Sequence, residues 1–515
     1  MSPVSFPVST PLYTLCNPFI NLYANPVDSP DVLMGCVFCI KSSDTFILMF
    51  SSIVFGGCTS VDVRVREVGG IRQVGLVRMS VSSYVAGLLR DIAEVDTPYI
   101  VGGVVRDFLS GIKSYDIDIA VKDFDRVVEY LKGLGYSVSE EAKSFRVVKV
   151  VLDDGEVIDV AGFRTEEYDF ISRKPKVAPA ESIYDDLSRR DFTINAMAVK
   201  VVDVGTDYVV GELVDPFGGY ADLRLGIIRA VRNPTARIME DPLRILRALR
   251  FAVKLGFTID KELWEAIKEL HPELRRVSAE RIRDELNKML LADPARALEL
   301  IYLSDVWRTV MPFLGSMAEV RHDYRGHHHG ESVLQHTLEA LNNLRRMHKL
   351  SIYNVLAVLL HDVGKPKTVK VEDGKVMFVG HAEESARIAR EWLRRMRYDN
   401  RTVRLVSEAV RIHEQVHNAR GSRKALARLW VEEAGEDPEV MELAIQVAEA
   451  DKGVRYDDVR ELIKEFINIP KPRGWLVMEI PEERRSHILR KLRIIQLTHG
   501  ITDIEKLKKL VRGIT

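Results

Sequence analysis

A glycine pair followed closely by an Asp-x-Asp pair limits what this chain can fold into more than any other feature. Gly102 and Gly103 follow a short apolar run at residues 99–101. Glycine has no Cβ, so a phosphate can approach the backbone, and a helix starting there would direct its positive end at the same place. Asp116 and Asp118 stand two apart in a strand-like run, so both carboxylates point to one face. The pattern predicts a two-Mg²⁺ phosphate site, whereas the plain alternative is a turn and an edge strand with solvated acids.

Further blocks downstream bear on that choice. Asp159 lies in another strand-like run and would supply a third carboxylate to the metals. Three strings then occur in order: RRDFTINAM at residues 189–197, DPFGG at 215–219 and EDPLR at 240–244. In this order and spacing, the blocks from roughly residue 98 to residue 290 resemble the class II tRNA nucleotidyltransferase and poly(A) polymerase family.

The resemblance implies a fold class and a set of site residues. The fold would be α+β: a polymerase-β-like nucleotidyltransferase head, followed by an all-α neck or body and an all-α HD domain. Asp116, Asp118 and Asp159 would be catalytic, with Mg²⁺ held by Asp116 and Asp118. The nucleotide-binding residues would be Gly102, Gly103, Arg106, Arg190, Asp191, Asn195, Asp241, Arg244 and Arg247.

Asp241 and Arg244 correspond to the pair with which this family reads the incoming base. Three apart on a helix, the two side chains would share one face. An arginine donates to ring nitrogen and carbonyl acceptors, and a carboxylate accepts from an exocyclic amino group. Cytosine and adenine carry such a group, so the pair would select C and A without a template. Outside the motif, an Asp/Arg pair at this spacing is usually a solvated ion pair.

A second set of candidate ligands begins after residue 325. Imidazole and carboxylate together suit a divalent transition metal such as Ni²⁺, Mn²⁺ or Co²⁺, which can acidify a water for phosphoester attack. The order of the residues resembles the HD-type phosphohydrolase domain appended to some bacterial CCA-adding enzymes, which is associated with hydrolysis of 2′,3′-cyclic and other phosphates on RNA ends. Any one of these histidines alone would more often be a hydrogen-bonded core or surface residue, and His327–His329 either line the pocket or form a polar loop. The predicted ligands are His336, His361, Asp362, His381, His413 and Asp451.

Together the two sets predict an enzyme that adds CCA to tRNA 3′ ends from CTP and ATP, with a second phosphohydrolase activity on RNA ends. One alternative is a poly(A) polymerase or an A-adding enzyme, because these share the motifs. Another alternative is an HD hydrolase whose head only binds RNA ends. The flexible loop that sets the change from C to A in the family corresponds to residues 164–181.

The sequence also predicts how the chain divides into domains. With 515 residues, of which 46% are hydrophobic, about three or four domains are expected. The first 78 residues hold all four cysteines and no Lys or Arg before Lys41, so we interpret them as an extension, disordered or mistranslated, before a functional start at Met79. The predicted units are 1–78 (extension), 79–232 (head), 233–318 (helical neck), 319–455 (HD domain) and 456–515 (basic helical tail).

Net charge, apolar stretches and cysteine content indicate where RNA could bind and in which compartment the protein works. The net charge of −1 means that RNA contacts must be local, for example at the basic tail from Pro481 or at residues 394–404. The apolar stretch at residues 46–55 is too short to span a membrane. Cys36 and Cys39 lack a second Cys or His pair at zinc-finger spacing, and the chain after Met79 has no cysteine, which fits a cytoplasmic protein.

Overall fold

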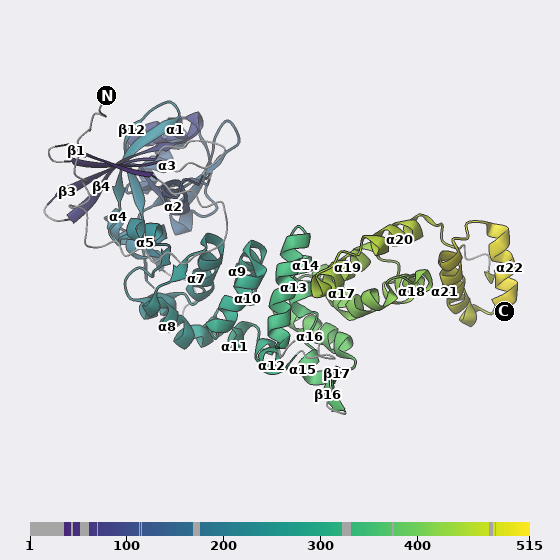
Figure 1. Cartoon of the computed structure of the whole chain (residues 1–515). Helices are drawn as coiled ribbons and strands as arrows, with labels where there is room; N and C mark the ends of the chain where they lie inside the picture. The colour runs from purple at the N-terminus through teal and green to yellow at the C-terminus, as the bar shows by residue number, and fades with distance from the viewer. Residues whose placement is uncertain are drawn as a thin grey trace, which may run out of the picture.

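The computed structural model describes residues 36–42, 45–51, 61–68, 71–112, 114, 116–167, 176–321, 331–372, 375–472, 477–478 and 480–514. Figure 1 shows an elongated molecule in which the sheet-containing head lies at one end and the helices α21 and α22 lie at the other. Between them, helices follow one another along the length of the chain. His327–His329, residues 168–175 of the predicted switch loop, and Cys16 and Cys58 lie outside the described residues.

One mixed sheet forms the head, and its strand order is β1-β2-β3-β4-β13-β12-β5-β6-β9-β8-β7. Strand β6 pairs with β9 in parallel, and the other neighbours that join β4 to β7 are antiparallel. The strands alternate buried and exposed residues, as in β9. Their bounds are β1 Cys36–Ser42, β2 Thr45–Ser51, β3 Val61–Val68, β4 Ile71–Ser80, β5 Tyr99–Val101, β6 Asp118–Val121, β7 Ser137–Ser139, β8 Val147–Val151, β9 Val157–Gly162, β12 Ala198–Val204 and β13 Tyr208–Val214.

Strand β4 crosses the boundary that the sequence analysis placed before Met79. Val77 and Met79 are buried in the head core, and β4 pairs with β13 from Leu76 opposite Glu212 to Ser80 opposite Tyr208. The residues just before Met79 are therefore part of the head sheet in this structure. The described parts of the segment predicted as an extension form β1, β2, β3 and most of β4.

Helices and short strand pairs complete the head. Apolar side chains of α1 and α3 pack with those of the sheet in one hydrophobic core, for example Leu88 and Val127 with Ile119. The head helices are α1 Ser83–Ala93, α2 Gly103–Leu109, α3 Phe124–Gly133, α4 Ile183–Ser188 and α5 Gly219–Leu225. Strands β10 Arg164–Glu167 and β11 Lys176–Pro179 pair separately, and β14 Ile227–Ile228 pairs with β15 Thr258–Ile259.

The neck and the rest of the chain are helical, as the hydrophobic spacing predicts. The neck helices are α6 Pro234–Glu240, α7 Arg244–Leu255, α8 Lys261–Leu270, α9 Ala279–Ala292, α10 Pro294–Leu303, α11 Trp307–Val310 and α12 Phe313–Glu319. The following helices are α13 Val333–Met347, α14 Ile352–Leu360, α15 Lys365–Thr368, α16 His381–Arg395, α17 Asn400–Ala419, α18 Arg423–Arg428, α19 Pro438–Lys452, α20 Asp457–Asn468, α21 Glu482–His499 and α22 Ile504–Ile514.

The α+β architecture is confirmed, with one correction to the region predicted as an all-α HD domain. Strands β16 Val369–Glu372 and β17 Lys375–Phe378 pair antiparallel between α15 and α16. In β16 valine alternates with charged residues, which has the period of a strand rather than of a helix. Among the described helices, none is long and apolar enough to cross a membrane.

Candidate functional site

Neighbouring strands bring together the three carboxylates predicted to be catalytic. Asp118 opens β6 and stands opposite Asp159 of the parallel neighbour β9. Asp116 precedes β6 by two residues, so its side chain lies on the face of Asp118, while Ile117 and Ile119 are buried on the other face. Strand alternation thus places Asp116, Asp118 and Asp159 on one side of the sheet.

The environment of Asp118 shows how close these charges are. Burial and then the neighbouring Asp116 carboxylate raise the pKa of Asp118 to about 6, against the opposing effect of the Arg190 guanidinium. A carboxylate cluster in this state carries an excess of negative charge, which a divalent cation relieves. The donor set of aspartate oxygens, partly open to solvent, therefore fits Mg²⁺.

Gly102 lies against this cluster. Its φ of +85° is a conformation that other residues rarely adopt, and an added Cβ would lie 3.1 Å from both Arg190 Nη1 and Asp118 Oδ2. The backbone conformation therefore favours glycine here, and a side chain would also crowd Arg190 and Asp118. Gly102 brings the start of α2 next to the carboxylates, as the sequence analysis predicted.

Lys149 is part of the site and was missed by the sequence analysis. Its Nζ lies 2.9 Å from Asp159 Oδ1, and the two residues face each other across β8 and β9. The ion pair is partly exposed, and its hydrogen bond to Asp159 raises the pKa of Lys149. The sequence contained a signal for this contact: the runs VVKVV and VID are close together and pair as a hairpin. In this hairpin Lys149 lies opposite Asp159.

Four of the predicted nucleotide-binding residues form a buried chain of hydrogen bonds between α2 and α7. Arg106 Nη1 donates to Asn195 Oδ1 at 2.7 Å, and Asn195 Nδ2 donates to Asp191 Oδ1 at 3.1 Å. Arg247 Nε donates to Asp191 Oδ2 at 2.8 Å. Burial disfavours the charged form, yet Arg247 holds the pKa of Asp191 below its usual value. Asp191 therefore joins the head to α7 in this structure, with both of its oxygens used inside the protein.

Arg190 faces the carboxylate cluster, and contacts on its other side fix its guanidinium group. Its Nη2 donates to Asp186 Oδ2 at 3.2 Å, and its Nη1 approaches the carbonyl of Asn195 at 3.4 Å. Burial opposes ionisation of Asp186, but Arg190 and Arg189 keep its pKa below the usual value. Arg190 is thus a positioned cation beside Asp118 and Gly102, suited to a phosphate.

The expectation that Asp241 and Arg244 share one helix is wrong. Asp241 has an extended backbone at the end of α6, and Arg244 is the first residue of α7. The physical reason is Pro242, because a residue before proline is pushed out of the helical region. Asp241 Oδ2 accepts from Arg281 Nη2 at 2.9 Å, whereas Arg244 Nη1 lies 2.8 Å from Glu240 Oε2. Each member of the pair is therefore held by its own partner.

The second predicted site is a buried cluster at the meeting point of α13, α14, α16, α17 and α19. His336, His361 and Asp451 each offer a ligand atom within 4.8 Å of the others, and Asp362, His381 and His413 form a second such group. His336 Nε2 lies 2.8 Å from Asp451 Oδ1 and 3.6 Å from Asp362 Oδ2, which joins the two groups. All six predicted ligands therefore meet in space, although they come from five separate segments of the chain.

Backbone carbonyls orient three of the histidines in this cluster. The Nδ1 atoms of His361, His381 and His413 lie 2.7, 2.9 and 2.6 Å from the carbonyl oxygens three residues earlier. If Nδ1 carries the proton that such a bond needs, Nε2 has a lone pair for a metal. Burial and then the nearby His361 ring lower the pKa of His413 to about 3, so this ring is neutral, as a ligand must be.

The donor set of this cluster fits a divalent transition metal better than Mg²⁺, because imidazole nitrogens outnumber carboxylates. Lys365 was missed by the sequence analysis. Its Nζ lies 2.6 Å from Asp362 Oδ2, and the spacing of three residues in HDVGK was the available signal. Close packing also orders this turn, because a Cβ on Gly364 would lie 2.5 Å from the backbone nitrogen of Ser385.

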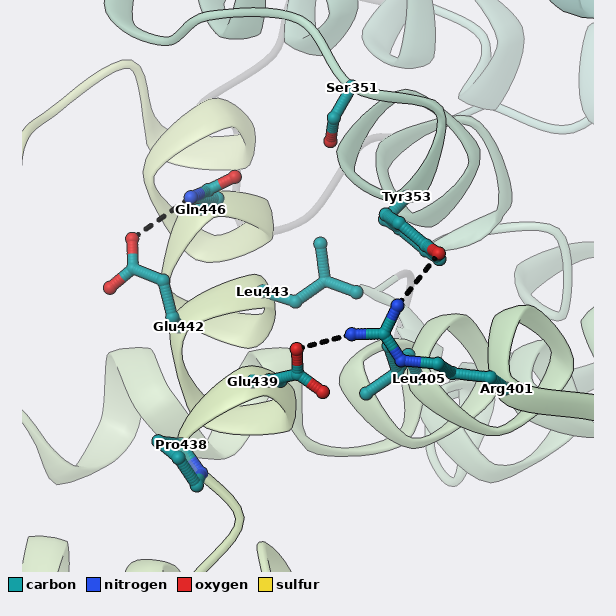
Figure 2. Close-up of a pocket in the computed structure, with 9 residues that line it drawn as sticks. All are labelled: Ser351, Tyr353, Arg401, Leu405, Pro438, Glu439, Glu442, Leu443 and Gln446. Carbon is teal, nitrogen blue, oxygen red and sulfur yellow. Dashed lines mark hydrogen bonds and ion pairs between the residues drawn. The ribbon is translucent and has the colours of Figure 1, made fainter.

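A pocket of about 330 Å³ lies between α14, α17 and α19. Figure 2 shows the residues that line it. Arg401 lines it and donates to Tyr353 Oη at 3.1 Å and to Glu439 Oε1 at 2.5 Å. Its lining shares no residue with either predicted site. The lining residues are Ser351, Tyr353, Arg401, Leu405, Pro438, Glu439, Glu442, Leu443 and Gln446.

Three family models match the chain in the order of these units. They are the poly A polymerase head domain at residues 98–229, the probable RNA and SrmB binding site of polymerase A at residues 256–317, and the HD domain at residues 333–454. Fold and sites thus define a protein with a nucleotidyltransferase-type head followed by an HD domain.

Two relatives with assigned names indicate which kind of nucleotidyltransferase the chain resembles. The CCA-adding enzyme of Leuconostoc mesenteroides is 39% identical over 204 residues, which are 39% of this chain and 48% of that protein. The A-adding tRNA nucleotidyltransferase of Deinococcus radiodurans is 31% identical over 327 residues, 61% of this chain and 68% of that protein. The chain belongs to the tRNA nucleotidyltransferase family, although it matches only about half the length of the CCA-adding relatives.

A solved structure supports the fold over a longer stretch. The CCA-adding enzyme of Thermotoga maritima, determined as a complex with tRNA, aligns with a TM-score of 0.56 at 24% identity. The alignment covers 84% of this chain and 94% of that one.

Proposed function

We propose that this protein adds CCA to the 3′ ends of tRNA from CTP and ATP. The observation that carries the proposal is the carboxylate cluster of Asp116, Asp118 and Asp159 beside Gly102 and the cation Arg190. Nucleotidyl transfer needs this combination, in which oxygen ligands hold Mg²⁺ and positive groups hold the triphosphate.

Each group has a role in the proposed transfer. Asp116 and Asp118 would hold Mg²⁺, which when bound neutralises the triphosphate and favours attack by the RNA 3′-hydroxyl. Arg190 lies where it can bind the leaving pyrophosphate, and Gly102 lets the triphosphate approach the backbone. Hydrogen bonds among Asp191, Asn195 and Arg247 hold α7, whose first residue is Arg244, in place against the head.

Base selection is assigned to Asp241 and Arg244. Both functional groups lie at the break between α6 and α7 and are held by Arg281 and Glu240. An incoming cytosine or adenine would exchange these protein partners for its amino group and ring nitrogen. A carbonyl at the position of the amino group would face the Asp241 carboxylate, which disfavours uracil and guanine.

A second activity is favoured by the buried cluster of His336, His361, Asp362, His381, His413 and Asp451. We propose that it holds a divalent transition metal and hydrolyses phosphoesters at RNA ends, such as 2′,3′-cyclic phosphates. Such a metal supplies Lewis-acid activation of the phosphoester and of the attacking water. The backbone bonds to His361, His381 and His413 keep the imidazoles pointing at one place.

There are two alternatives to CCA addition. An A-adding enzyme is supported by the Deinococcus relative, which is named for that activity and matches more of this chain than the Leuconostoc enzyme does. A hydrolase with an RNA-binding head is disfavoured by the intact Asp116 and Asp118, since binding alone would not need them.

The deciding experiment supplies labelled CTP and ATP to tRNAs that lack CCA, CA or only the final A. The proposal expects incorporation of C, C and A in that order on the shortest substrate. Incorporation of A alone, and only on tRNA that ends in CC, would establish the A-adding alternative. No incorporation on any substrate with Mg²⁺ present would leave the HD site as the active one.

A further inference from the structure

Helix α9 contacts both the break between α6 and α7, where Asp241 and Arg244 lie, and the HD domain. On one side of α9, Arg281 Nη2 donates to Asp241 Oδ2 at 2.9 Å, and Glu285 Oε2 lies 2.7 Å from Arg250 Nε of α7. Arg281 and Glu285 are one helical turn apart, so they hold this side of α9 against α6 and α7. The position of α9 therefore sets where the partner of Asp241 lies.

The other side of α9 contacts the turn between α16 and α17. Arg283 Nη1 donates to the carbonyl of Arg397 at 2.5 Å, and Tyr398 Oη donates to Asn287 Oδ1 at 2.5 Å. Arg283 and Asn287 are again one turn apart and face the HD domain. Arg397 has a φ of +59°, a left-handed conformation that is uncommon for arginine and that presents its carbonyl in this turn.

The turn is itself fixed to the neck. Trp392 Nε1 of α16 donates to the carbonyl of Val310 at 2.8 Å in a buried bond. Arg395 Nη2 donates to the carbonyl of Thr309 at 3.0 Å. The end of α16 thus docks on α11 as well as on α9, so the contact with α9 is part of an ordered interface. The start of α16 carries His381 of the buried cluster.

We propose that the turn between α16 and α17 positions α9, and through Arg281 the carboxylate of Asp241, so that the HD domain contributes to nucleotide choice in the head. The inference rests on the proposed role of Asp241 in base reading. Arg283, Asn287 and Tyr398 are positioning residues, since none of them belongs to the carboxylate cluster or to the buried His/Asp cluster. Asp241 has an extended backbone, and its Oδ1 accepts the backbone N–H of Leu243 at 3.1 Å. Arg281 holds the other oxygen, Oδ2, so a small shift of α9 changes how this oxygen meets a base.

The test compares Tyr398→Phe and Arg283→Met with Glu280→Gln. Tyr398→Phe keeps the ring and removes the hydroxyl, and Arg283→Met keeps most of the stem. Glu280 is exposed in the first turn of the same helix and serves as the matched control. The readout is the ratio of kcat/KM for CTP to that for UTP on tRNA lacking CCA, with the melting temperature and cyclic-phosphate hydrolysis measured on the same preparations.

The expected result is a fall in the CTP/UTP ratio of about two- to thirtyfold for Arg283→Met, the range that mutations along coupled contacts produce, and a smaller fall for Tyr398→Phe. Arg283→Lys, which keeps a donor, should recover part of the ratio, and Glu280→Gln should leave it unchanged. The fall should occur at unchanged melting temperature and hydrolysis rate.

Two results would overturn the inference in distinguishable ways. An unchanged ratio in Arg283→Met and Tyr398→Phe, while Asp241→Ala loses selectivity, would show that α9 does not transmit position. An unchanged ratio in Asp241→Ala as well would show that base reading lies elsewhere, and the inference would fall with that part of the proposed function. If Arg283→Met does not fold, the isosteric Tyr398→Phe alone decides.

Discussion

The head and the HD domain build their candidate sites in opposite ways. The head places aspartates on neighbouring strands at the edge of solvent, where Arg190 and Lys149 balance part of their charge. The HD domain buries imidazoles and carboxylates between helices, and backbone carbonyls orient the rings. The head carboxylates are therefore partly open to solvent, whereas backbone contacts already orient three imidazoles of the HD cluster.

The contrast matches the metal that each site is proposed to hold. Mg²⁺ keeps several waters and binds through a few carboxylates together with phosphates, so partly open aspartates suit it. A transition metal held by imidazole needs neutral rings in fixed directions. The two sites also draw on different parts of the chain, so we expect them to act independently.

The largest expected effect is the loss of transfer on removing a head ligand. Asp118→Ala should lower nucleotide incorporation by at least about a hundred- to a thousandfold, the loss seen when one electrostatic stabiliser is removed. Hydrolysis of a 2′,3′-cyclic nucleotide should continue. The measurement is single-turnover incorporation of CTP, with Asp203→Ala, an exposed aspartate of the same head, as the control. Near wild-type transfer in Asp118→Ala would break the assignment of the head site.

The converse change should break the other site. His361→Ala should abolish cyclic-phosphate hydrolysis and weaken binding of the transition metal by about tenfold or more, because the remaining ligands no longer complete the set. Metal content by mass spectrometry and hydrolysis rate are the readouts, with the exposed His487→Ala as control. Joint loss of transfer in a folded His361→Ala protein would contradict independence.

A moderate effect is expected on base choice. Asp241→Ala should reduce discrimination against UTP and GTP by about 1–3 kcal/mol, the scale of one base contact, and weaken tRNA binding less. Competition between CTP and UTP measures this ratio directly. Unchanged preference in both Asp241→Ala and Arg244→Ala would move selection to another part of the molecule.

Protons should compete with Mg²⁺ for Asp118 in the head site. The pKa of Asp118 is raised to about 6, so below that pH a proton occupies the carboxylate, and Mg²⁺ affinity should fall as the pH drops through 6. Because folding raises this pKa, ionisation of Asp118 costs stability as the pH rises, and Mg²⁺ should offset that cost above pH 6. Thermal shifts with Mg²⁺ at pH 5 and pH 7.5 test the sign, and Asp118→Asn should remove the difference. A Mg²⁺ shift as large at pH 5 as at pH 7.5 in the wild-type protein would contradict it.

The smallest expected effect concerns Lys149. Its ammonium group competes with a metal for Asp159, so Lys149→Met should lower the Mg²⁺ concentration needed for half-maximal transfer by up to about fivefold, the range of a surface ion pair. Lys132, which pairs with Glu140 on the same head, offers the matched control Lys132→Met. An increased Mg²⁺ requirement in Lys149→Met would show that the lysine assists the metal site instead.

Strand periodicity explains why much of the head could be predicted. The period of two placed Asp116 and Asp118 on one face. The apolar run at residues 99–101 and the strand-like run that contains Asp159 correspond to β5 and β9. Pairing partners cannot be read this way, so β4 and the position of Lys149 opposite Asp159 were missed. The break between Asp241 and Arg244 had a signal in Pro242 that outweighs helical spacing.

The HD cluster was predicted by residue type and order rather than by geometry. Which helices converge depends on packing of apolar faces over long sequence separations, and no local pattern shows it. The bonds from the Nδ1 atoms of His361 and His413 to the carbonyls of Val358 and Val410, in contrast, follow from a spacing of three residues. Local geometry was predictable, and the convergence of the helices was not.

We propose that this chain holds two independent metal sites with different chemistry. The most direct measurement strips the wild-type protein with a chelator and restores one metal at a time, assaying CTP incorporation on tRNA and cyclic-phosphate hydrolysis in parallel. Mg²⁺ alone should restore incorporation without hydrolysis, and Ni²⁺, Mn²⁺ or Co²⁺ should be needed for hydrolysis. Restoration of both activities by Mg²⁺ alone, or a requirement of incorporation for the transition metal, would contradict it.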